Sequence, residues 1–397
     1  MSLSQTAPSA GLEQGYRTAL LDWLACAVGG HDQRAARAAR SLGEGLGDRI
    51  AAAGTAGHVL DFDDTYLPGL SHLSAPVAPA ALLVGAHLGA RIGDALAAFA
   101  AGFEAMGRLT AANHPQMRAR GWHPTAVGGT VGAAAAASRL LDLDADRTAH
   151  AVRLALLQAG GLRAAFGSDG KALQVGRAAA AGATGARLAA AGAVASADIE
   201  RGEGGFEQAF GARWVDLASS SAPERAAVGD NWIKAYPCCL QTHGAIEAAV
   251  QARSAAAGTP SDIVVTVHPV CLHAASLGPD VRDGLQAKFS IPYLTAFALL
   301  HGPPTVKSFA GVDDAARQLA ERVRLHTDAG LLESEAVVEV AGERAGHVRA
   351  ALGSPARPMD ATWLQDKVRD LAGDRLDGVL DDLGAPVAQV VDAASLR

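Results

Sequence analysis

The sequence predicts a mainly α-helical protein, with a large all-helical domain built from both chain ends and a smaller α+β domain inserted between them. From residue 16 to residue 195, apolar residues recur at helical spacing and glycine-rich breaks separate the segments. Alternating, β-branched segments begin only after about residue 222, and a helical pattern returns near the C-terminus. The length of 397 residues also suits two domains better than one core.

The composition indicates how the predicted helices pack. Hydrophobic residues make up 49% of the chain but aromatic residues only 5%, and there are 45 glycines. A core of alanine, leucine and valine lets helices approach closely. One predicted helix, residues 131–141, ends at the turn 142–144, where Asp144 caps the next helix. The apolar stretch 75–102 contains charged residues and prolines, so it predicts buried helices and not a membrane span.

The middle of the chain combines strands and helices. It begins after a serine-rich break at residues 219–223. Strands are predicted at residues 261–269, 334–341 and 342–350, and helices at residues 288–300 and 312–325. The last helical pattern, residues 359–383, is expected to pack back on the first helices. The predicted domains are therefore residues 1–235 with 356–397, and residues 236–355.

Charge and cysteine content exclude several classes of function. The net charge is −7, and no basic run could follow a phosphate backbone, so no nucleic-acid partner is expected. The four cysteines lack the spacing of metal knuckles, redox motifs or iron-sulfur clusters. The N-terminal residues lack the features of a secretory signal. We therefore expect a soluble, cytoplasmic protein without a metal or cofactor and without a membrane partner.

Polar side chains that could carry chemistry occur in five segments. In the first, residues 58–65 (HVLDFDDT), a helix would place His58, Asp61 and Thr65 on one face. An acid and a hydroxyl would then reach the same pocket, and His72 follows shortly after. The alternative is an acidic helix end in solvent, because acidic clusters are common on protein surfaces.

The second and third segments place a histidine and a lysine beside distinctive backbone features. His123 lies between a tryptophan and a proline in GWHPT, residues 121–125, and could transfer a proton near neutral pH. A structural histidine is the alternative. Lys171 precedes an alanine-rich helix, residues 172–192, where an ammonium opposes the helix dipole at a cost of about 0.3–1 kcal/mol. A carboxylate bound at the helix N-terminus would explain this placement, and an exposed lysine is the alternative.

The last two segments lie at and beyond the predicted domain junction, where ligand clefts usually form. Residues 234–243 (KAYPCCLQTH) contain Lys234 and His243, and the two cysteines between them are expected to fill space. Residues 288–293 (KFSIPY) supply an ammonium, a hydroxyl and a phenol, from Lys288, Ser290 and Tyr293. The alternative for this segment is a helix cap followed by a core aromatic.

Taken in order, these motifs resemble the MmgE/PrpD family, the 2-methylcitrate dehydratase family, which also includes cis-aconitate decarboxylases and iminodisuccinate epimerases. The matching pieces are DFDDT (61–65), GWHPT (121–125), Lys171 with the following GRAAAAG, YPCC up to His243, and KFSIPY (288–293). The resemblance spans nearly the whole chain. It implies a homodimer, an α+β lid domain, and a metal-free active site between the domains. His72 departs from the family pattern, because Leu73-Ser74 follow it where Pro-Ser is common.

The resemblance also marks the expected site residues. Positions similar to the family's catalytic residues are Asp61, Thr65, His72, His123, Lys171 and His243. Residues expected to bind substrate are Lys234, Lys288, Ser290 and Tyr293. The substrate that the resemblance implies is a small polycarboxylate.

A lyase reaction on such a substrate can be assembled from these groups. Elimination of water from a citrate-like acid needs a base, an acid for the leaving hydroxyl, and cations for the carboxylates. We hypothesise that His123 or Lys171 removes the proton, while Asp61 and Thr65 orient the substrate and the leaving group. The carboxylates would be neutralised by Lys171, Lys234 and His243. Dehydration is ranked first, and decarboxylation or epimerisation is the alternative, because each breaks a bond at a carbanion beside a carboxylate.

Two other classes of function fit the residues less well. A non-catalytic helical dimer would not need the acid, imidazole and ammonium groups of Asp61, His123, Lys171 and His243. A metal hydrolase lacks an HExxH-like spacing, although it could draw its ligands from His58, Asp61, His72 and His123.

Overall fold

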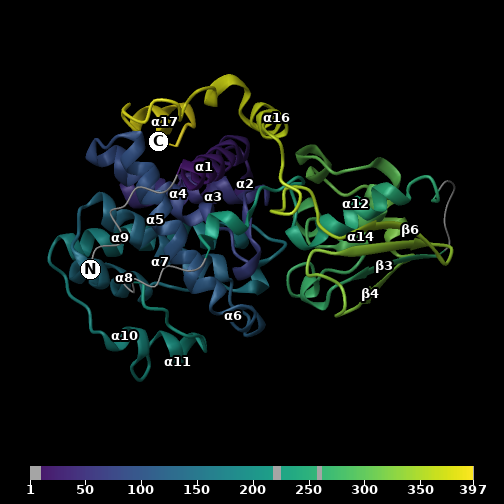
Figure 1. Cartoon of the computed structure of the whole chain (residues 1–397), viewed down its shortest axis with the longest axis horizontal. Coiled ribbons are helices and arrows are strands. Elements are labelled where there is room, and N and C mark those ends of the chain that lie inside the picture. Colours follow the sequence, from purple (N-terminus) through teal and green to yellow (C-terminus); the bar gives the residue numbers. More distant parts are fainter. Residues whose placement is uncertain (1–9, 218–224, 257–261, 397) are drawn as a thin grey trace.

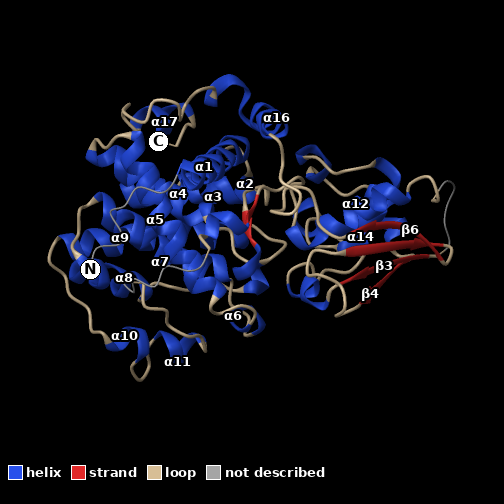
Figure 2. Cartoon of the chain, in the orientation of Figure 1, coloured by secondary structure: helices blue, strands red, loops and turns tan. Residues whose placement is uncertain are grey.

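The computed structural model describes residues 10–217, 225–256 and 262–396, and these residues fold mainly into helices (Figure 1, Figure 2). The α-helices are α1 (Ala10–Gly30), α2 (Arg34–Arg40), α3 (Leu46–Val59), α4 (Ser74–Leu88), α5 (Ile92–Ala111), α6 (Gln116–Ala119), α7 (Pro124–Leu140), α8 (Ala145–Leu156), α9 (Gly170–Ala190), α10 (Asp198–Arg201), α11 (Phe206–Phe210), α12 (His243–Ala252), α13 (Gly284–Ala287), α14 (Ile291–His301), α15 (Asp314–Ala320), α16 (Ala361–Ala372) and α17 (Ala388–Ala393). The strands are β1 (Thr65–Tyr66), β2 (Asn231–Trp232), β3 (Ile263–Val267), β4 (Val323–Thr327), β5 (Ala336–Val340) and β6 (Glu343–Val348). The prediction of a mainly α protein is confirmed.

Small residues allow the central helices to touch backbone to backbone. Helix α7 packs against α5 and α9, and α9 packs against α3. A Cβ atom on Gly102 of α5 would lie 2.4 Å from the carbonyl oxygen of Gly132 on α7, and one on Gly176 of α9 would lie 2.1 Å from that of Ala51 on α3. Any side chain larger than hydrogen would force these helices apart. The abundance of glycine and alanine therefore serves close helix packing.

The largest cluster of buried apolar residues takes side chains from both chain ends. Trp23 on α1 and Val391 on α17 both belong to it and are almost fully buried. Helix α16 packs on α1, and α17 packs on α4. In Figure 1 the yellow C-terminal segment runs over the purple N-terminal helices. The predicted packing of the C-terminal segment on the first helices is confirmed.

A second cluster of buried apolar residues surrounds the four-stranded sheet, whose order is β4-β3-β5-β6. Strand β3 pairs in parallel with β4 and antiparallel with β5, and β5 and β6 form a hairpin. Helices α12 and α14 pack against this sheet (Figure 2). The short strands β1 and β2 pair with each other, with Thr65 opposite Trp232. This pairing joins the loop after α3 to the chain segment that enters the sheet region.

Several element predictions are confirmed and two are wrong. Asp144 caps α8 by accepting from the backbone N–H of Arg147 at 2.8 Å, and the three predicted strands correspond to β3, β5 and β6. The predicted helix 312–325 is wrong beyond Ala320, because Val323 begins β4, which is stabilised by pairing with β3. The predicted helical pattern 359–383 contains α16 only as far as Ala372, where Gly373 adopts a φ of 60°. The break 219–223 and residue 261 lie outside the described residues.

Within residues 10–217, 225–256 and 262–396, no helix is both long and apolar enough to cross a membrane. The apolar stretch 75–102 forms the buried helix α4 and the first half of α5. Most of its apolar residues are buried against other helices, whereas His87, Arg91 and Asp94 are exposed. The prediction that residues 75–102 form buried helices is confirmed.

Candidate active site

The chain has only five lysines, and four of them are buried. The buried ones are Lys171, Lys234, Lys288 and Lys367, each at most 6% exposed, whereas Lys307 is exposed. Lysine is almost never fully buried unless its ammonium finds polar partners, because desolvating the charge is costly. Four buried ammonium groups therefore indicate a candidate functional site in which positive charge is concentrated.

Three of these lysines hold the loop that follows α3. The carbonyl oxygens of residues 60, 61 and 62 each accept a hydrogen bond from a different ammonium, those of Lys288, Lys234 and Lys367 in that order. The bond from Lys234 is 2.8 Å long, and so is the bond from Lys367. Asp61 has a φ of 52°, in the left-handed region, so its side chain leaves the direction of α3. Residues 58–65 therefore do not form one helix, and the helical arrangement considered for His58, Asp61 and Thr65 does not occur.

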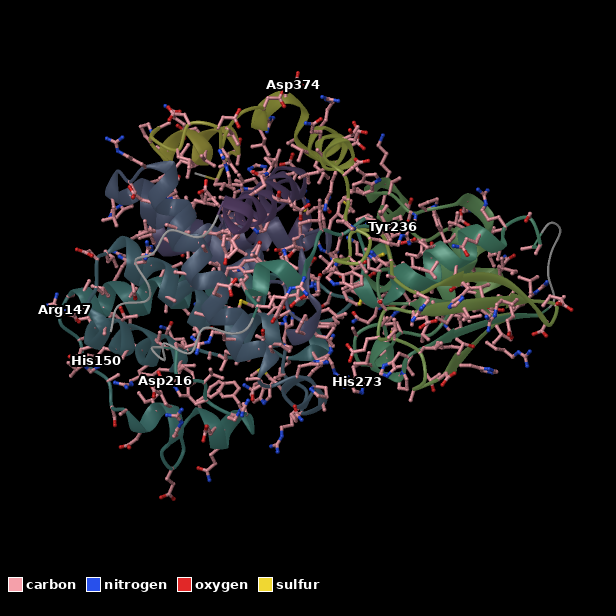
Figure 3. The ribbon with its side chains drawn as sticks, viewed as in Figure 1. Arg147, His150, Asp216, Tyr236, His273 and Asp374 are labelled. Atoms are coloured by element: carbon pink, nitrogen blue, oxygen red, sulfur yellow. The ribbon has the colours of Figure 1, made fainter. Side chains whose placement is uncertain are left out.

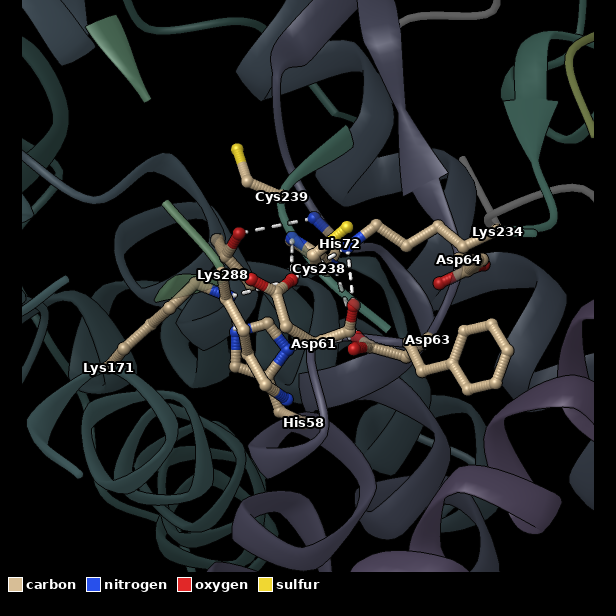
Figure 4. A network of polar contacts seen from close by, with 12 residues as sticks. His58, Asp61, Asp63, Asp64, His72, Lys171, Lys234, Cys238, Cys239 and Lys288 are labelled. Atoms are coloured by element: carbon tan, nitrogen blue, oxygen red, sulfur yellow. Dashed lines mark hydrogen bonds and ion pairs between the residues drawn. The ribbon is translucent and has the colours of Figure 1, made fainter. Parts of the chain in front are cut away.

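The Asp61 carboxylate lies at the centre of the lysine cluster (Figure 4). Its Oδ1 is 2.6 Å from Nζ of Lys234, 3.3 Å from Nζ of Lys171 and 3.8 Å from Nε2 of His72. Burial alone would raise the pKa of Asp61, but Lys171 and Lys234 hold it well below its ordinary value of 3.8. Asp61 is therefore ionised and neutralises part of the positive charge around it.

A second series of polar contacts, through His58 to Asp63, holds the ammonium of Lys171. Its Nζ is 2.9 Å from Nε2 of His58, whose Nδ1 lies 2.9 Å from Oδ2 of Asp63. The same carboxylate oxygen is 3.1 Å from Nδ1 of His72, but that contact is poorly aligned for a hydrogen bond. Burial lowers the pKa of Lys171 from 10.5, and Asp61 partly opposes this effect. The lysine is therefore a stronger acid than a lysine in water.

One cluster of ligand-type residues has the spacing of a metal site. One ligand atom from each of His58, Asp63 and His72 lies within 4.8 Å of the others. Nδ1 of His58 is already bonded to Asp63, and the ammonium of Lys171, bonded to the same ring, would repel a bound cation. This cluster fits a hydrogen-bonded network better than a metal site.

A small cavity lies beside the Asp61 carboxylate, between the helical part and the sheet part of the molecule. Five predicted catalytic residues line it: Asp61, Thr65, His72, His123 and Lys171. The structure thus brings together groups from the loop after α3, from β1, from the loop before α4, from the N-cap of α7 and from α9, which are up to about a hundred residues apart in sequence. The cavity has a volume of about 20 Å³, enough for about one water, whereas ligand pockets usually have about 300–1,000 Å³. The site is therefore closed in this structure.

The other predicted site residues lie behind the cavity wall. Lys234 and Lys288 reach the loop 60–62 from outside the cavity. Ser290 caps α14 by accepting from the backbone N–H of Tyr293, and the Tyr293 hydroxyl accepts from the backbone N–H of Asp313. Their structural roles match the alternative of a helix cap and a core aromatic.

His243 is also buried behind the wall, with its ring 5.0 Å from that of Tyr236, which Figure 3 labels. Burial lowers the pKa of His243 to about 3, and the nearby Lys234 adds to this effect. The ring is therefore neutral near pH 7. A direct contact of His243 with substrate stays a prediction.

Sequence reasoning missed Arg118, which lines the cavity from α6. Its Nε donates to the carbonyl oxygen of His273 at 3.0 Å, and its guanidinium lies 5.3 Å from the ring centre of Phe166. His273 is labelled in Figure 3. Burial lowers the pKa of Arg118 to about 10, so the group remains a cation at neutral pH. The local sequence gives no signal for this role, because the similar Arg120 two residues later is exposed.

Positive charge exceeds negative charge around the cavity in the described part of the chain. The cations are Lys171, Lys234, Lys288 and Arg118, and the carboxylates within the same network are Asp61 and Asp63, which leaves an excess of two positive charges. Asp64 faces away and is bonded to Ser74, and burial raises its pKa to about 7. The whole chain is acidic, with a net charge of −7, so the excess is local. A ligand with two or more carboxylates would compensate it.

We expect the protein to lose stability in mild acid. Burial lowers the pKa of four histidines below 6.5, namely His58, His72, His123 and His243. Burial raises the pKa of two carboxyls, Asp22 and Asp64, which opposes the effect. As the pH falls below 6.5, the unfolded chain therefore takes up protons on these histidines that the folded chain does not, and each such proton lowers the free energy of unfolding by about 1.4 kcal/mol per pH unit. Urea unfolding at pH 6.5, 5.5 and 4.5 would test this, and a constant midpoint would contradict it.

Comparison with known proteins places the chain in a family. Residues 49–217 match the model of the MmgE/PrpD N-terminal domain, and residues 236–384 match that of the MmgE/PrpD C-terminal domain. The chain is 30% identical over 272 residues to cis-aconitate decarboxylase of Homo sapiens, a match that covers 64% of this chain and 56% of the relative. It is 30% identical over 300 residues to cis-aconitate decarboxylase of Mus musculus, covering 68% of this chain and 59% of the relative.

A third relative, a cis-aconitate decarboxylase-like protein of Aspergillus oryzae, is 37% identical over 166 residues, 39% of this chain and 34% of the relative. The matches therefore span less than two thirds of the length of each of these relatives. The two family models together cover most of the chain, from residue 49 to residue 384. As its motifs predict, the chain belongs to the MmgE/PrpD family.

Proposed function

We propose that this protein is a lyase that acts on a small polycarboxylate without a bound metal, and that its reaction is decarboxylation of a cis-aconitate-like tricarboxylate. The observation that carries the proposal is the excess of two positive charges around the closed cavity, which a multiply charged carboxylate would neutralise. The sequence ranks dehydration first. The names of the relatives move decarboxylation ahead of it.

The groups that line the cavity can serve such a reaction. A carbon–carbon bond to one carboxylate breaks, carbon dioxide leaves, and the electron pair is delocalised over the adjacent double bond and a remaining carboxylate. A proton then forms a new carbon–hydrogen bond. Arg118 and Lys171 would hold the anion, and Lys171, whose pKa burial lowers, is suited to deliver that proton. His72 is the other candidate donor, and it would need to gain a proton first, because burial lowers its pKa to about 3.

Dehydration of a hydroxy acid is the second candidate, supported by Thr65. Its Oγ1 is buried at the cavity and has no hydrogen-bond partner among the described residues. A buried hydroxyl without a partner favours a ligand that supplies one, such as a substrate hydroxyl beside Asp61. The same cations would hold the carboxylates of either substrate.

Proton NMR in deuterated buffer would separate these reactions. The purified protein is incubated with cis-aconitate, 2-methylcitrate, citrate and iminodisuccinate, each with and without a strong chelator. We expect cis-aconitate to lose carbon dioxide, with one deuterium entering the product, and the rate to be unchanged by the chelator. Loss of water from a hydroxy acid would replace decarboxylation with the second candidate. Inertness toward all four compounds would contradict the proposed function.

The division into domains and the oligomeric state belong to the same proposal. We propose that the two clusters of buried apolar residues are the cores of a helical domain, residues 1–235 with 356–397, and of a lid domain, residues 236–355. Because the cavity holds only about one water, the lid would have to move away before a tricarboxylate could enter. The homodimer and the cytoplasmic location stay predictions, and sedimentation velocity would test the first.

A further inference from the structure

The side-chain amide of Gln174 has a defined orientation. Gln174 lies on α9, three residues after Lys171, so both side chains leave the same face of the helix. Its Oε1 accepts from the backbone N–H of Leu162 at 2.9 Å, and its Nε2 donates to the carbonyl oxygen of Leu162 at 3.3 Å. Rotating the amide by half a turn would oppose oxygen to oxygen and N–H to N–H. The backbone of Leu162 therefore decides which way the amide points.

This orientation determines which nitrogen of His123 carries the proton. Nε2 of Gln174 lies 2.6 Å from Nδ1 of His123. An amide nitrogen only donates hydrogen bonds, so Nδ1 of His123 must be the acceptor and keeps its lone pair. A neutral His123 ring then carries its proton on Nε2. Among the described residues, no group is hydrogen-bonded to that nitrogen, and the ring lines the cavity.

The amide of Gln174 also disfavours the protonated form of His123. An imidazolium has N–H groups at both positions, so its Nδ1–H would face the N–H of Gln174 at 2.6 Å. Burial lowers the pKa of His123 well below 6.5, and Lys171 lowers it further. The ring contacts His58, stacked at 6.1 Å, and Phe166 at 4.9 Å, and the nearby His72 and Arg118 lower its pKa further. Among the described residues, none of these groups supplies a negative charge.

We propose that Gln174 is a positioning residue that holds His123 as the neutral Nε2–H tautomer, so that His123 donates a hydrogen bond to the substrate and does not abstract a proton. This inference rests on the proposed function for the identity of the acceptor, a carboxylate that gains charge when its neighbouring bond breaks. A neutral imidazole can stabilise such charge without transferring its proton. The proton at carbon is then transferred by Lys171 or His72. Of the two bases hypothesised from the sequence, His123 and Lys171, this proposal excludes His123.

Nitrogen NMR of the full chain, labelled with ¹⁵N in its histidines, tests the tautomer directly. The signals of His123 are assigned from their loss in His123→Gln. At pH 7 we expect Nδ1 in the range of an unprotonated ring nitrogen and Nε2 in the range of a protonated one. Gln174→Met removes the donor and should give a mixture of tautomers. Gln174→Glu supplies an acceptor, so it should place the proton on Nδ1 and raise the pKa of His123.

Gln158→Met is the matched control, because Gln158 is exposed and should leave the His123 signals unchanged. With a substrate found by the panel, Gln174→Glu should lower kcat roughly 100- to 1,000-fold at nearly constant KM, as loss of one positioned donor does. A protonated Nδ1 in the unaltered protein would overturn the inference even if the variants failed to fold. So would an unchanged tautomer in Gln174→Met. The expected spectra together with no turnover of any panel compound would support the tautomer and contradict the proposed function.

Discussion

Replacing Lys171 with methionine is expected to lower kcat roughly 1,000-fold while the protein remains folded. The ammonium lines the cavity, 3.3 Å from Oδ1 of Asp61 and 2.9 Å from Nε2 of His58. Methionine has a similar length and fills the space without the charge. Because the site holds excess positive charge, removing one cation should leave the free energy of unfolding unchanged or raise it. Asp61 keeps its contact with Lys234 in the variant.

The control is Lys307→Met, which removes the one exposed lysine and should leave kcat unchanged. Both variants would be compared with the unaltered protein by steady-state kinetics on the compound that the panel identifies, and by thermal unfolding. If Lys171→Met kept more than about a tenth of the turnover, Lys171 could not be the main proton donor or anion ligand. If Lys171→Met lost activity only because it unfolded, the conclusion that the site holds excess positive charge would be wrong.

Replacing Lys367 with methionine is expected to destabilise the protein by about 3–5 kcal/mol, the usual cost of breaking a buried ion pair. Its ammonium lies 2.6 Å from Oδ1 of Asp22 on α1 and donates to the carbonyl oxygens of Phe62 and Lys234. It also lies 3.8 Å from the ring centre of Phe62. Without it, Asp22 would be a buried carboxylate with no ion-pair partner among the described residues. The loop 60–62 would also lose one of its three lysine contacts, so kcat should fall as well.

The double variant Asp22→Asn with Lys367→Met tests the reason for this effect. It removes both charges, so it should recover much of the free energy of unfolding that the single change loses. Urea unfolding of the two single variants and the double variant would give the coupling. Equal stability of Lys367→Met and the unaltered protein would contradict the structural role of Lys367. A double variant no more stable than Lys367→Met would show that Asp22 is not the group left unpaired.

The local sequence predicted most elements, and it failed where a distant segment decides the conformation. Asp144 stops one helix and starts the next through its own backbone contacts, so a local pattern was sufficient. Residues 323–327 form β4 only because β3, about sixty residues earlier, offers a pairing edge. The loop after α3 leaves the helical conformation at Asp61, where lysines from three distant segments bind its carbonyl groups. Neither the strand conformation of residues 323–327 nor the loop conformation at Asp61 can be predicted from the segment's own residues.

By itself the sequence determined the mainly helical fold, the family, and the five residues Asp61, Thr65, His72, His123 and Lys171 that meet at the cavity. It did so because side-chain periodicity and short motifs are local properties. Only the tertiary structure decided that four lysines are buried around one loop, that Arg118 faces the cavity while Arg120 faces solvent, and that Gln174 sets the tautomer of His123. Burial, charge excess and hydrogen-bond direction depend on which distant segments pack together, and packing is a property of the whole chain.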